Sequence, residues 1–478
     1  MLMKSYRFAA LAAAVLALSA CGGGGGGGET PSTPSTPSTP APSVPLPSTP
    51  APTASISLSK SKSAIGESVT VNWSSTNATS CNGADAFSGQ LNSTGSQTVT
   101  PSKGGKFTYT VTCTGAGGSV TQSATLVVPM PVLATSYMNA KDTGIGAQDM
   151  PYSTSFRSKE AVTAGHQFAD FFQEGEYSML AASNVFDAVG EYGSTTVGKI
   201  FFFKKVGTSW VDKTSDLLSD QTGCISPRKV VVADFNGDKK PDAFIACHGI
   251  DGKVPPGQEE GETSRFIMSQ PDGRYTNTAT NFKCYCHGAS AADFSGAGYA
   301  DLVITDTVHD RLPTLLINNR NGTFSKDNSG LSLETVAVIN NIARLIYTVE
   351  FVDVDGDGIL DLFVAGAEND GKTQQLSDAW FPPTVYKGTG NRTFKTKLGT
   401  IAANSEYSVV LDIVVKSGKI AVLRTNSDYT KMGVQVINST TFNTTSFTPV
   451  TYKDTLWMTL LNGNIIGAFN SNPYTITW

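Results

Sequence analysis

Three stretches of the chain share one pattern, in which a polar, acidic turn lies between two apolar runs. They read VVVADFNGDKKPDAFIA from Val230, AADFSGAGYADLVIT from Ala291 and FVDVDGDGILDLFVA from Phe351. The apolar runs are continuous, which is typical of strands buried on both faces. The first aspartates of the three stretches are 59 and 60 residues apart. A strand–turn–strand unit at a constant period predicts a repeat architecture.

Weaker copies extend the pattern on both sides. Asp170 lies 64 residues before the first of these aspartates, and Asp412 lies 59 residues after the last. A final copy, TLWMTLLNGNIIGAF, has the same shape without acidic residues. The copies predict six blades of a β-propeller over residues 130–478, the last of them short. Segment 132–138 can supply the missing outer strand and close the ring.

Residues 54–129 show a different pattern, in which apolar and polar positions alternate. Val69, Val71 and Trp73 form one such run, and residues 107–113 form another. A period of two predicts half-buried strands, separated here by turns rich in Gly, Asn and Ser. Short strands of this kind predict a small β-sandwich, so that the whole protein is expected to be all-β.

The composition fits an exported protein of this class. Charged residues make up 16% of the 478 residues, and 47 residues are glycine. The net charge is −5 and no basic run occurs, which argues against nucleic acid as a partner. The chain also lacks the patterns of a nucleophile elbow, a HExxH zinc site and a P-loop.

The N-terminal residues predict export and lipid anchoring. Lys4 and Arg7 precede an apolar stretch that is too short to cross a bilayer. The next residues, LSAC, resemble the lipobox of bacterial lipoproteins. That resemblance implies that residues 1–20 are a signal peptide and that lipid on Cys21 anchors the chain. Gly22 implies an outer-membrane address.

Residues 21–53 follow the predicted lipid. They consist of a glycine run and repeated Pro-Ser-Thr units, which cannot build a core. Such a segment predicts an extended tether that lifts the rest of the chain away from the membrane. We therefore expect a surface-exposed protein with a partner outside the cell.

Both structured parts resemble known families. The acidic repeats resemble the FG-GAP/VCBS repeats of integrin-alpha-like β-propellers across residues 160–425. This resemblance implies six or seven blades, calcium loops and a ligand face on the opposite side. The segments VTVNWSSTNATSC and TYTVTCTGAGG resemble bacterial immunoglobulin-like modules. That resemblance implies that residues 54–129 act mainly as a spacer.

Two of the acidic turns carry the ligands that a calcium ion requires, which are about seven oxygens in a tight loop. The ligands expected in one loop are Asp353, Asp355, Asp357, Asp361 and the carbonyl of Ile359. Those expected in the other are Asp234, Asn236, Asp238, Asp242 and the carbonyl of Lys240. We expect these two ions to be structural, because such loops leave little room for a substrate.

The third acidic turn is less complete. Asp293, Ser295 and Asp301 remain, but Ala297 has replaced a ligand. We expect this loop to bind calcium weakly or not at all.

A candidate ligand site lies on the other face. Each acidic turn joins the first strand of a copy to its second strand, so the start of the first strand and the end of the second strand share the opposite face. The residues expected there are Arg228, His248, His287, His309 and Glu368. One alternative is that these are polar residues of solvated loops. A second alternative is a catalytic site in which a histidine acts as general base beside Arg228. A third is a transition-metal site.

Six cysteines besides Cys21 are expected to form disulfides in an oxidising compartment. Cys81 and Cys113 predict one bridge in the sandwich. Cys224 and Cys247 are expected on adjacent strands, which favours a second bridge. Cys284 and Cys286 are separated by one residue, and their pairing, structural or redox-active, stays open.

These observations support three hypotheses for function. The first is a surface lipoprotein that binds an extracellular glycan or protein, in an adhesion-type role. The second is an extracellular hydrolase or lyase acting on a polysaccharide or phosphoester at the face that carries histidine and arginine. The third is a scaffold for envelope assembly. A propeller is a platform, and sequence alone does not choose among them.

Overall fold

β-Strands form nearly all of the regular structure in this computed structural model, which confirms the all-β prediction, and α2 (Thr214–Leu217) is the one helix among the described residues. The structure describes residues 49–132, 160–185, 196–207, 209–250, 261–307, 312–331, 346–368, 382–427, 430–450, 458–461, 464–467 and 474–476. The predicted signal peptide, Cys21 and nearly all of the tether lie outside these residues. In the described part, no helix is long and apolar enough to cross a membrane.

Residues 53–128 form two antiparallel sheets around one core, with strand orders β1-β2-β5 and β4-β3-β6-β7. The strands are β1 (Thr53–Leu58), β2 (Val69–Thr76), β3 (Ser80–Asp85), β4 (Gly89–Leu91), β5 (Thr94–Val99), β6 (Gly105–Gly115) and β7 (Gly118–Val128). Alternate residues of β2 and β6 are buried, as the period of two predicted. A disulfide joins Cys81 to Cys113, which are paired across β3 and β6 inside this core.

Six further sheets follow among the described residues, and we number them I to VI. Sheet I contains β8 (Glu160–Ala169), β9 (Ser178–Val185), β10 (Ile200–Val206) and β11 (Ser209–Asp212); sheet II contains β12 (Pro227–Ala233), β13 (Asp242–Cys247), β14 (Glu262–Ser269) and β15 (Tyr275–Cys284); sheet III contains β16 (Cys286–Ala292), β17 (Asp301–Asp306), β18 (Pro313–Asn318) and β19 (Phe324–Lys326).

Sheet IV contains β20 (Ile346–Val352), β21 (Asp361–Gly366), β22 (Thr384–Lys387) and β23 (Thr396–Thr400); sheet V contains β24 (Val409–Lys416), β25 (Lys419–Thr425), β26 (Met432–Asn438) and β27 (Thr444–Val450); sheet VI contains β28 (Met458–Leu461), β29 (Asn464–Gly467) and β30 (Tyr474–Ile476). In every sheet the strands are antiparallel and lie in sequence order.

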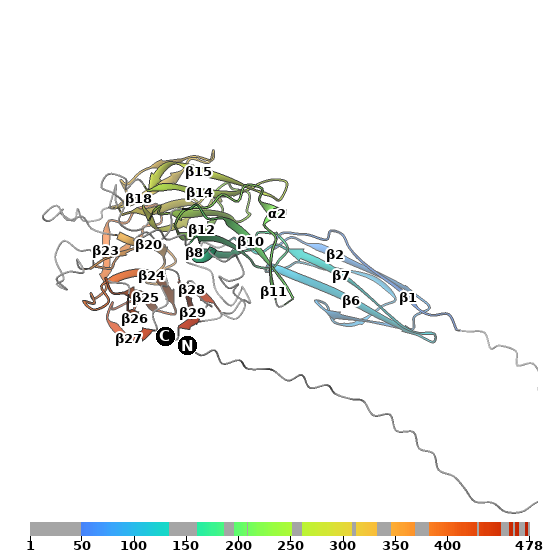
Figure 1. Ribbon diagram of the computed structural model, residues 1–478. Coiled ribbons are helices and arrows are strands. Elements are labelled where there is room, and N and C mark those ends of the chain that lie inside the picture. The colour runs from blue at the N-terminus through green and yellow to red at the C-terminus, as the bar shows by residue number, and fades with distance from the viewer. Residues whose placement is uncertain are drawn as a thin grey trace, which may run out of the picture. The chain divides into compact units, whose positions relative to one another are not determined.

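The sheets are arranged like the blades of a β-propeller. The first strand of each sheet packs against the first strand of the next, from β8 through β12, β16, β20 and β24 to β28. Figure 1 shows these sheets following one another from green to red. Apolar clusters fill the spaces between successive sheets from I to V, and the inner strands are buried on both faces. This explains the continuous apolar runs of the sequence.

Each of the first strands in sheets I to V contains an irregularity in its pairing. The register shifts between Val162 and Gly165, Pro227 and Lys229, Cys286 and Ala289, Ile346 and Thr348, and Val410 and Asp412. A β-bulge bends a strand and re-aims its side chains. The expectation that Asp412 belongs to an acidic turn is therefore wrong. Asp412 follows the bulge of β24, and the turn of that sheet comes later, at Ser417 and Gly418.

The position after the bulge holds a buried network of charges. Lys229 of sheet II contacts Glu350 of sheet IV at 2.5 Å and Asp412 of sheet V at 2.9 Å. All three residues are buried. Burial alone would lower the pKa of Lys229, but the two carboxylates raise it above its ordinary value, so the ammonium stays charged. One cation thus connects first strands from three sheets.

We expect Lys229→Met to destabilise the protein by about 3–5 kcal/mol, because it leaves two buried carboxylates without a cation. Urea unfolding of the wild type and the variant measures the change. The matched control is Lys395→Met, which removes an exposed lysine and should change stability by less than about 0.5 kcal/mol. If the two variants unfold alike, the network does not hold the sheets together.

Candidate functional site

The turns between the first and second strands of sheets II, III and IV, which we call loops II, III and IV, share one backbone structure. Asp234 accepts hydrogen bonds from the backbone N–H groups of Gly237 at 2.7 Å and Lys239 at 2.8 Å. In loop IV, the same bonds run to Asp353 from Gly356 at 2.8 Å and from Gly358 at 2.9 Å. Both loop IV glycines have positive φ, which suits glycine in so tight a turn. The first aspartate thus organises its loop.

The last aspartate of each loop ties that loop to the third strand of its sheet. Asp242, Asp301 and Asp361 are fully buried. Asp242 accepts a hydrogen bond from the backbone N–H of Ser269 at 2.7 Å. Asp301 accepts one from Asn318 at 2.8 Å, and Asp361 accepts one from Gly388 at 2.9 Å. Burial raises the pKa of Asp242 to about 7, although hydrogen bonds from Ser269 and Phe235 lower it. A nearby cation would offset this cost of burying a carboxylate.

Loops II and IV fit a calcium ion by the chemistry of their donors. Carboxylate oxygens of Asp353, Asp355 and Asp361 lie within 4.8 Å of one another. Lys387 of β22 contacts Asp355 and Asp357, which shows that the loop IV carboxylates attract a cation. In loop II, the hydroxyl of Ser269 donates hydrogen bonds to Asp238 at 3.0 Å and to Asp242 at 2.7 Å, so it links two of the expected ligands.

Loop III does not fit calcium. Ala297 offers no side-chain oxygen, and Asp293 already accepts hydrogen bonds from Ser295 and Gly298. The guanidinium of Arg392 contacts the buried Asp301. A guanidinium from another sheet therefore pairs with the last aspartate of this loop.

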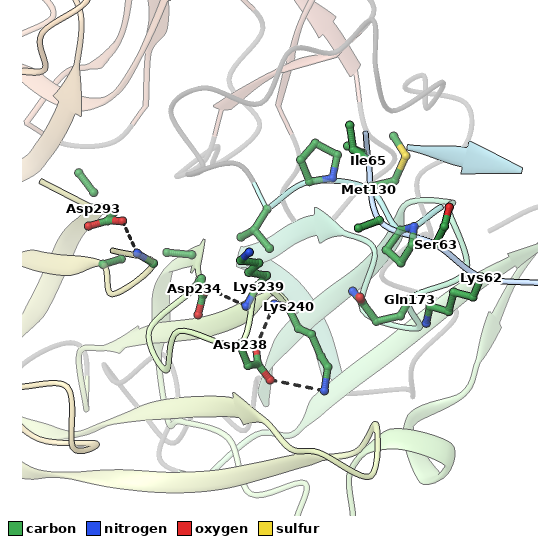
Figure 2. Close-up of a pocket in the computed structure, with 18 residues that line it drawn as sticks. Lys62, Ser63, Ile65, Met130, Gln173, Asp234, Asp238, Lys239, Lys240 and Asp293 are labelled. Carbon is green, nitrogen blue, oxygen red and sulfur yellow. Dashed lines mark hydrogen bonds and ion pairs between the residues drawn. The ribbon is translucent and has the colours of Figure 1, made fainter. Parts of the chain in front are cut away.

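A cavity of about 700 Å³ reaches loops II and III. Asp234, Asp238 and Asp293 lie on its wall, together with Lys62 and Ile65 from the loop after β1 (Figure 2). The expectation that the acidic loops leave little room for another molecule is therefore wrong for loop II.

The opposite face gathers the side chains of the first-strand bulges. Arg228, His287 and Tyr347 occupy the bulges of sheets II, III and IV. The ring centroid of His287 lies 4.4 Å from that of His248 and 4.6 Å from that of Tyr347. The Tyr285 ring lies 4.5 Å from His248. We call Arg228, His248, Tyr285, His287 and Tyr347 the histidine cluster.

Gly288 permits this contact between sheets III and IV. A Cβ atom at Gly288 would lie 2.7 Å from the backbone oxygen of Tyr347. The absence of a side chain therefore lets β16 approach β20 closely, so that His287 reaches Tyr347.

Glu262 fixes the segments that carry Arg228 and His248. Its carboxylate accepts the backbone N–H of Ile225 at 2.9 Å, of Ser226 at 3.1 Å and of Gly249 at 2.9 Å. These three N–H groups lie on the two chain segments that flank β12 and β13. Glu262 thus holds both segments in one position.

Two disulfides brace the same region. One joins Cys224 to Cys247, next to His248, and the other joins Cys284 to Cys286, on either side of Tyr285. All four cysteines are buried. The sulfur of Cys284 lies 3.9 Å from the backbone oxygen of Cys247, so the two bridges are neighbours. Covalent bonds therefore fix the backbone on which the cluster is built.

The buried imidazole of His248 lies close to the charge of Arg228. His248 is 5% exposed, and its Nδ1 has no hydrogen-bond partner in the described part of the chain. Burial, and then the charge of Arg228, hold the pKa of His248 well below its ordinary value. The described residues around the cluster include carboxylates as well as the guanidinium of Arg228. Asp306 accepts the backbone N–H of Tyr285 at 3.4 Å, and Glu262 accepts that of Gly249 at 2.9 Å.

Glu368 and His309 are the other predicted site residues. Glu368 forms a buried ion pair with Arg424 at 2.9 Å and accepts the backbone N–H of Asn404, so its carboxylate has a structural role. His309 lies outside the described residues. A further histidine, His166, is buried inside β8. Sequence reasoning missed Tyr285 and Tyr347. The available signals were that Tyr285 is adjacent to Cys284 and that Tyr347 lies at the start of a first strand.

His166 makes the stability of the fold depend on pH. It is 2% exposed, and burial lowers its pKa to about 3 from the ordinary value of 6.5. Below pH 6.5 the unfolded chain therefore binds the proton that the folded chain excludes, so this histidine destabilises the fold as the pH falls towards 3.

We expect His166→Leu to reduce the loss of stability on acidification by roughly 1.4 kcal/mol per pH unit between about pH 6 and pH 5. Denaturant unfolding of both proteins at several pH values measures the two slopes. Parallel slopes would mean that His166 titrates normally in the fold.

Comparisons with known proteins support the repeat. The FG-GAP-like repeat family matches residues 293–364, which include loops III and IV. None of the curated proteins matches the chain. A putative phosphatase from Bacteroides thetaiotaomicron is similar in structure at 9% identity, with 89% of this chain and 97% of that chain covered and a TM-score of 0.39.

Two rhamnogalacturonan lyases, the exotype enzyme YesX and YesW, are also similar in structure. Their identities are 12% and 14%, and their TM-scores are 0.37 and 0.33. The alignments cover 86% and 87% of this chain and 80% and 81% of the lyases. These TM-scores are too low to carry a function from either enzyme to this chain.

Proposed function

We propose that this protein is an exported, calcium-binding β-propeller lipoprotein that binds an acidic extracellular ligand, a glycan or a protein, at the histidine cluster. The observation that carries the proposal is the bracing of that cluster by Glu262 and two disulfides. A binding site needs its side chains held in one geometry before the ligand arrives. A solvated loop without a ligand needs no such support.

The chemistry of the cluster defines the class of ligand. Arg228 supplies a guanidinium, which pairs with carboxylate or phosphate through two parallel hydrogen bonds. His287 and Tyr347 are partly exposed beside it and offer hydrogen bonds and ring surfaces. An acidic sugar or an acidic protein segment suits this combination.

The rest of the chain serves the same role in this proposal. Lipid on Cys21 holds the protein at the outer membrane, and the tether of residues 21–53 extends it outwards. An immunoglobulin-like spacer, residues 54–129, precedes a propeller of six or seven blades over residues 130–478. The ligand site is then presented at a distance from the membrane.

An enzyme is the second candidate, and one feature favours a lyase over a hydrolase. Glycoside hydrolysis generally uses two carboxylates that flank the bond, whereas the carboxylates of Asp306 and Glu262 beside the cluster accept backbone N–H groups. Proton abstraction next to a carboxylate needs a base and a cation that neutralises the carboxylate. His287 and Arg228 have those chemical properties.

We expect Arg228→Gln to weaken binding of an acidic polysaccharide about ten- to a hundredfold, which is the worth of a charge-assisted hydrogen bond. The experiment incubates the calcium-loaded full chain with galacturonate and glucuronate polymers, measures binding by calorimetry, and examines the polymers by mass spectrometry. The control Arg274→Gln removes a guanidinium from the β14–β15 turn and should bind like the wild type.

The outcomes separate the two candidates. Binding without chemical change supports a binding protein and excludes the lyase for these polymers. Unsaturated products that are lost in His287→Gln would make the protein an enzyme. Equal binding by wild type and Arg228→Gln would contradict a site at the cluster, and protein ligands would then be tested in the same way.

We also propose one calcium ion each in loops II and IV. The ligands are Asp234, Asn236, Asp238, Asp242 and the Lys240 carbonyl in loop II, and Asp353, Asp355, Asp357, Asp361 and the Ile359 carbonyl in loop IV. When bound, calcium would neutralise the clustered carboxylates and raise stability by linkage. Lys387 would compete with the ion of loop IV, because its ammonium contacts two of the same carboxylates.

We expect Lys387→Met to tighten calcium binding at loop IV roughly three- to tenfold, as two ion pairs no longer compete with the metal. Calcium titration by calorimetry measures the affinity, and a chelator should lower the thermal midpoint of the wild type. Lys395→Met is again the control and should leave the affinity unchanged. Weaker calcium binding by the Lys387 variant would show that this lysine supports the site.

A further inference from the structure

Arg392 lies where two sheets meet. It belongs to the turn between β22 and β23 of sheet IV, yet its guanidinium contacts Asp301 at the start of β17 in sheet III. Asp301 is fully buried, and its other oxygen accepts the backbone N–H of Asn318 at 2.8 Å. The guanidinium therefore satisfies the remaining oxygen of a carboxylate that has no access to water.

The backbone around Arg392 is shaped for this contact. Its φ is +65°, in the left-handed region that residues other than glycine adopt uncommonly. Its backbone oxygen would lie 2.0 Å from a Cβ atom at Gly330, so glycine there allows the turn to approach sheet III. Next to it, Phe394 donates its N–H to the Gly330 oxygen at 2.8 Å. The turn is thus seated on sheet III by several independent contacts.

We propose that Arg392 takes the place of calcium in loop III and fastens sheet IV to sheet III. A divalent cation needs several anionic ligands, and loop III retains two carboxylates where loop IV has four. One guanidinium, with a single positive charge and fixed hydrogen-bond directions, matches the reduced set. A metal ion would hold one loop, whereas Arg392 joins two sheets.

Arg392, which contacts loop III, and Lys387, which contacts loop IV, differ in the carboxylates that they reach. Lys387 comes from the same sheet as loop IV and contacts Asp355 and Asp357, which are partly exposed. Lys387 also lies 3.9 Å from the buried Asp361 of its own sheet, whereas Arg392 crosses to another sheet and contacts the buried Asp301 directly. Calcium can displace the lysine into solvent, but removing Arg392 would leave Asp301 buried without a cation.

The turn of sheet I offers a parallel. Asp170 occupies the position of the first ligand, and its carboxylate accepts the N–H groups of Glu174 and Gly175 at 2.8 Å each. It also accepts the N–H of Met130 at 3.0 Å, from the segment that follows β7. Here too, a carboxylate accepts a donor from a distant segment, in a loop where Ser178 stands at the position of the last aspartate.

The first test counts bound calcium ions by native mass spectrometry of the full chain. The inference predicts no ion in loop III of the wild type, and one additional ion in the double variant Ala297→Asp/Arg392→Gln. The control is the single variant Asp293→Asn, which alters loop III alone. It should bind the same number of calcium ions as the wild type, because loop III binds none. A wild-type count that falls in Asp293→Asn would overturn the proposal.

The second test does not depend on any metal. In the presence of a chelator, the coupling between Asp301→Asn and Arg392→Gln is measured by a double-mutant cycle in urea. We expect a coupling of about ten- to a hundredfold in the unfolding equilibrium constant. Additive effects would overturn the proposal even if loops II and IV bind calcium. If those loops bind none, a coupled pair still supports it.

Discussion

The contact of Lys229 with Glu350 and Asp412 is the interaction on which the arrangement of the sheets depends. Apolar surfaces between neighbouring sheets attract without direction, so they allow small rotations of one sheet against the next. A buried ammonium shared by carboxylates of two other sheets does not allow such rotations. Moving any of these charges away from its partner would cost several kcal/mol. All three residues lie on inner strands. Lys229 and Asp412 directly follow a bulge, and Glu350 lies further along β20. The network therefore selects one arrangement from many apolar ones.

The same physical problem, a buried carboxylate, recurs in the turns and has several solutions. In sheet III the cation is a guanidinium from the next sheet, and in sheet I backbone N–H groups replace it. In loop IV a lysine of the same sheet stands near four carboxylates. The turns therefore differ in the group that contacts the carboxylate, which is a guanidinium, a set of backbone N–H groups or a lysine.

The sequence was informative where a signal is local. Continuous apolar runs, the acidic period and the alternation of residues 54–129 predicted strands, turns and the sandwich pattern that the structure contains. Local signals failed for Asp412, because counting a period does not detect a bulge. They also do not predict the ion pair of Glu368, whose partner Arg424 comes from another sheet. The two partners of Lys229 are Glu350, which is 121 residues away in the sequence, and Asp412, which is 183 residues away. No local pattern in the sequence predicts contacts over such distances.

The histidine cluster shows how a repeated fold produces a single site. Bulges occur in the first strands of sheets I to V, so the geometry that presents a side chain at the face is repeated. Arg228, His287 and Tyr347 occupy it in sheets II to IV, whereas sheet V has Leu411. The polar side chains are thus confined to adjacent sheets, and the two disulfides lie at this same place. Variation at one repeated position, and not a change of fold, is what gives this face its chemical character.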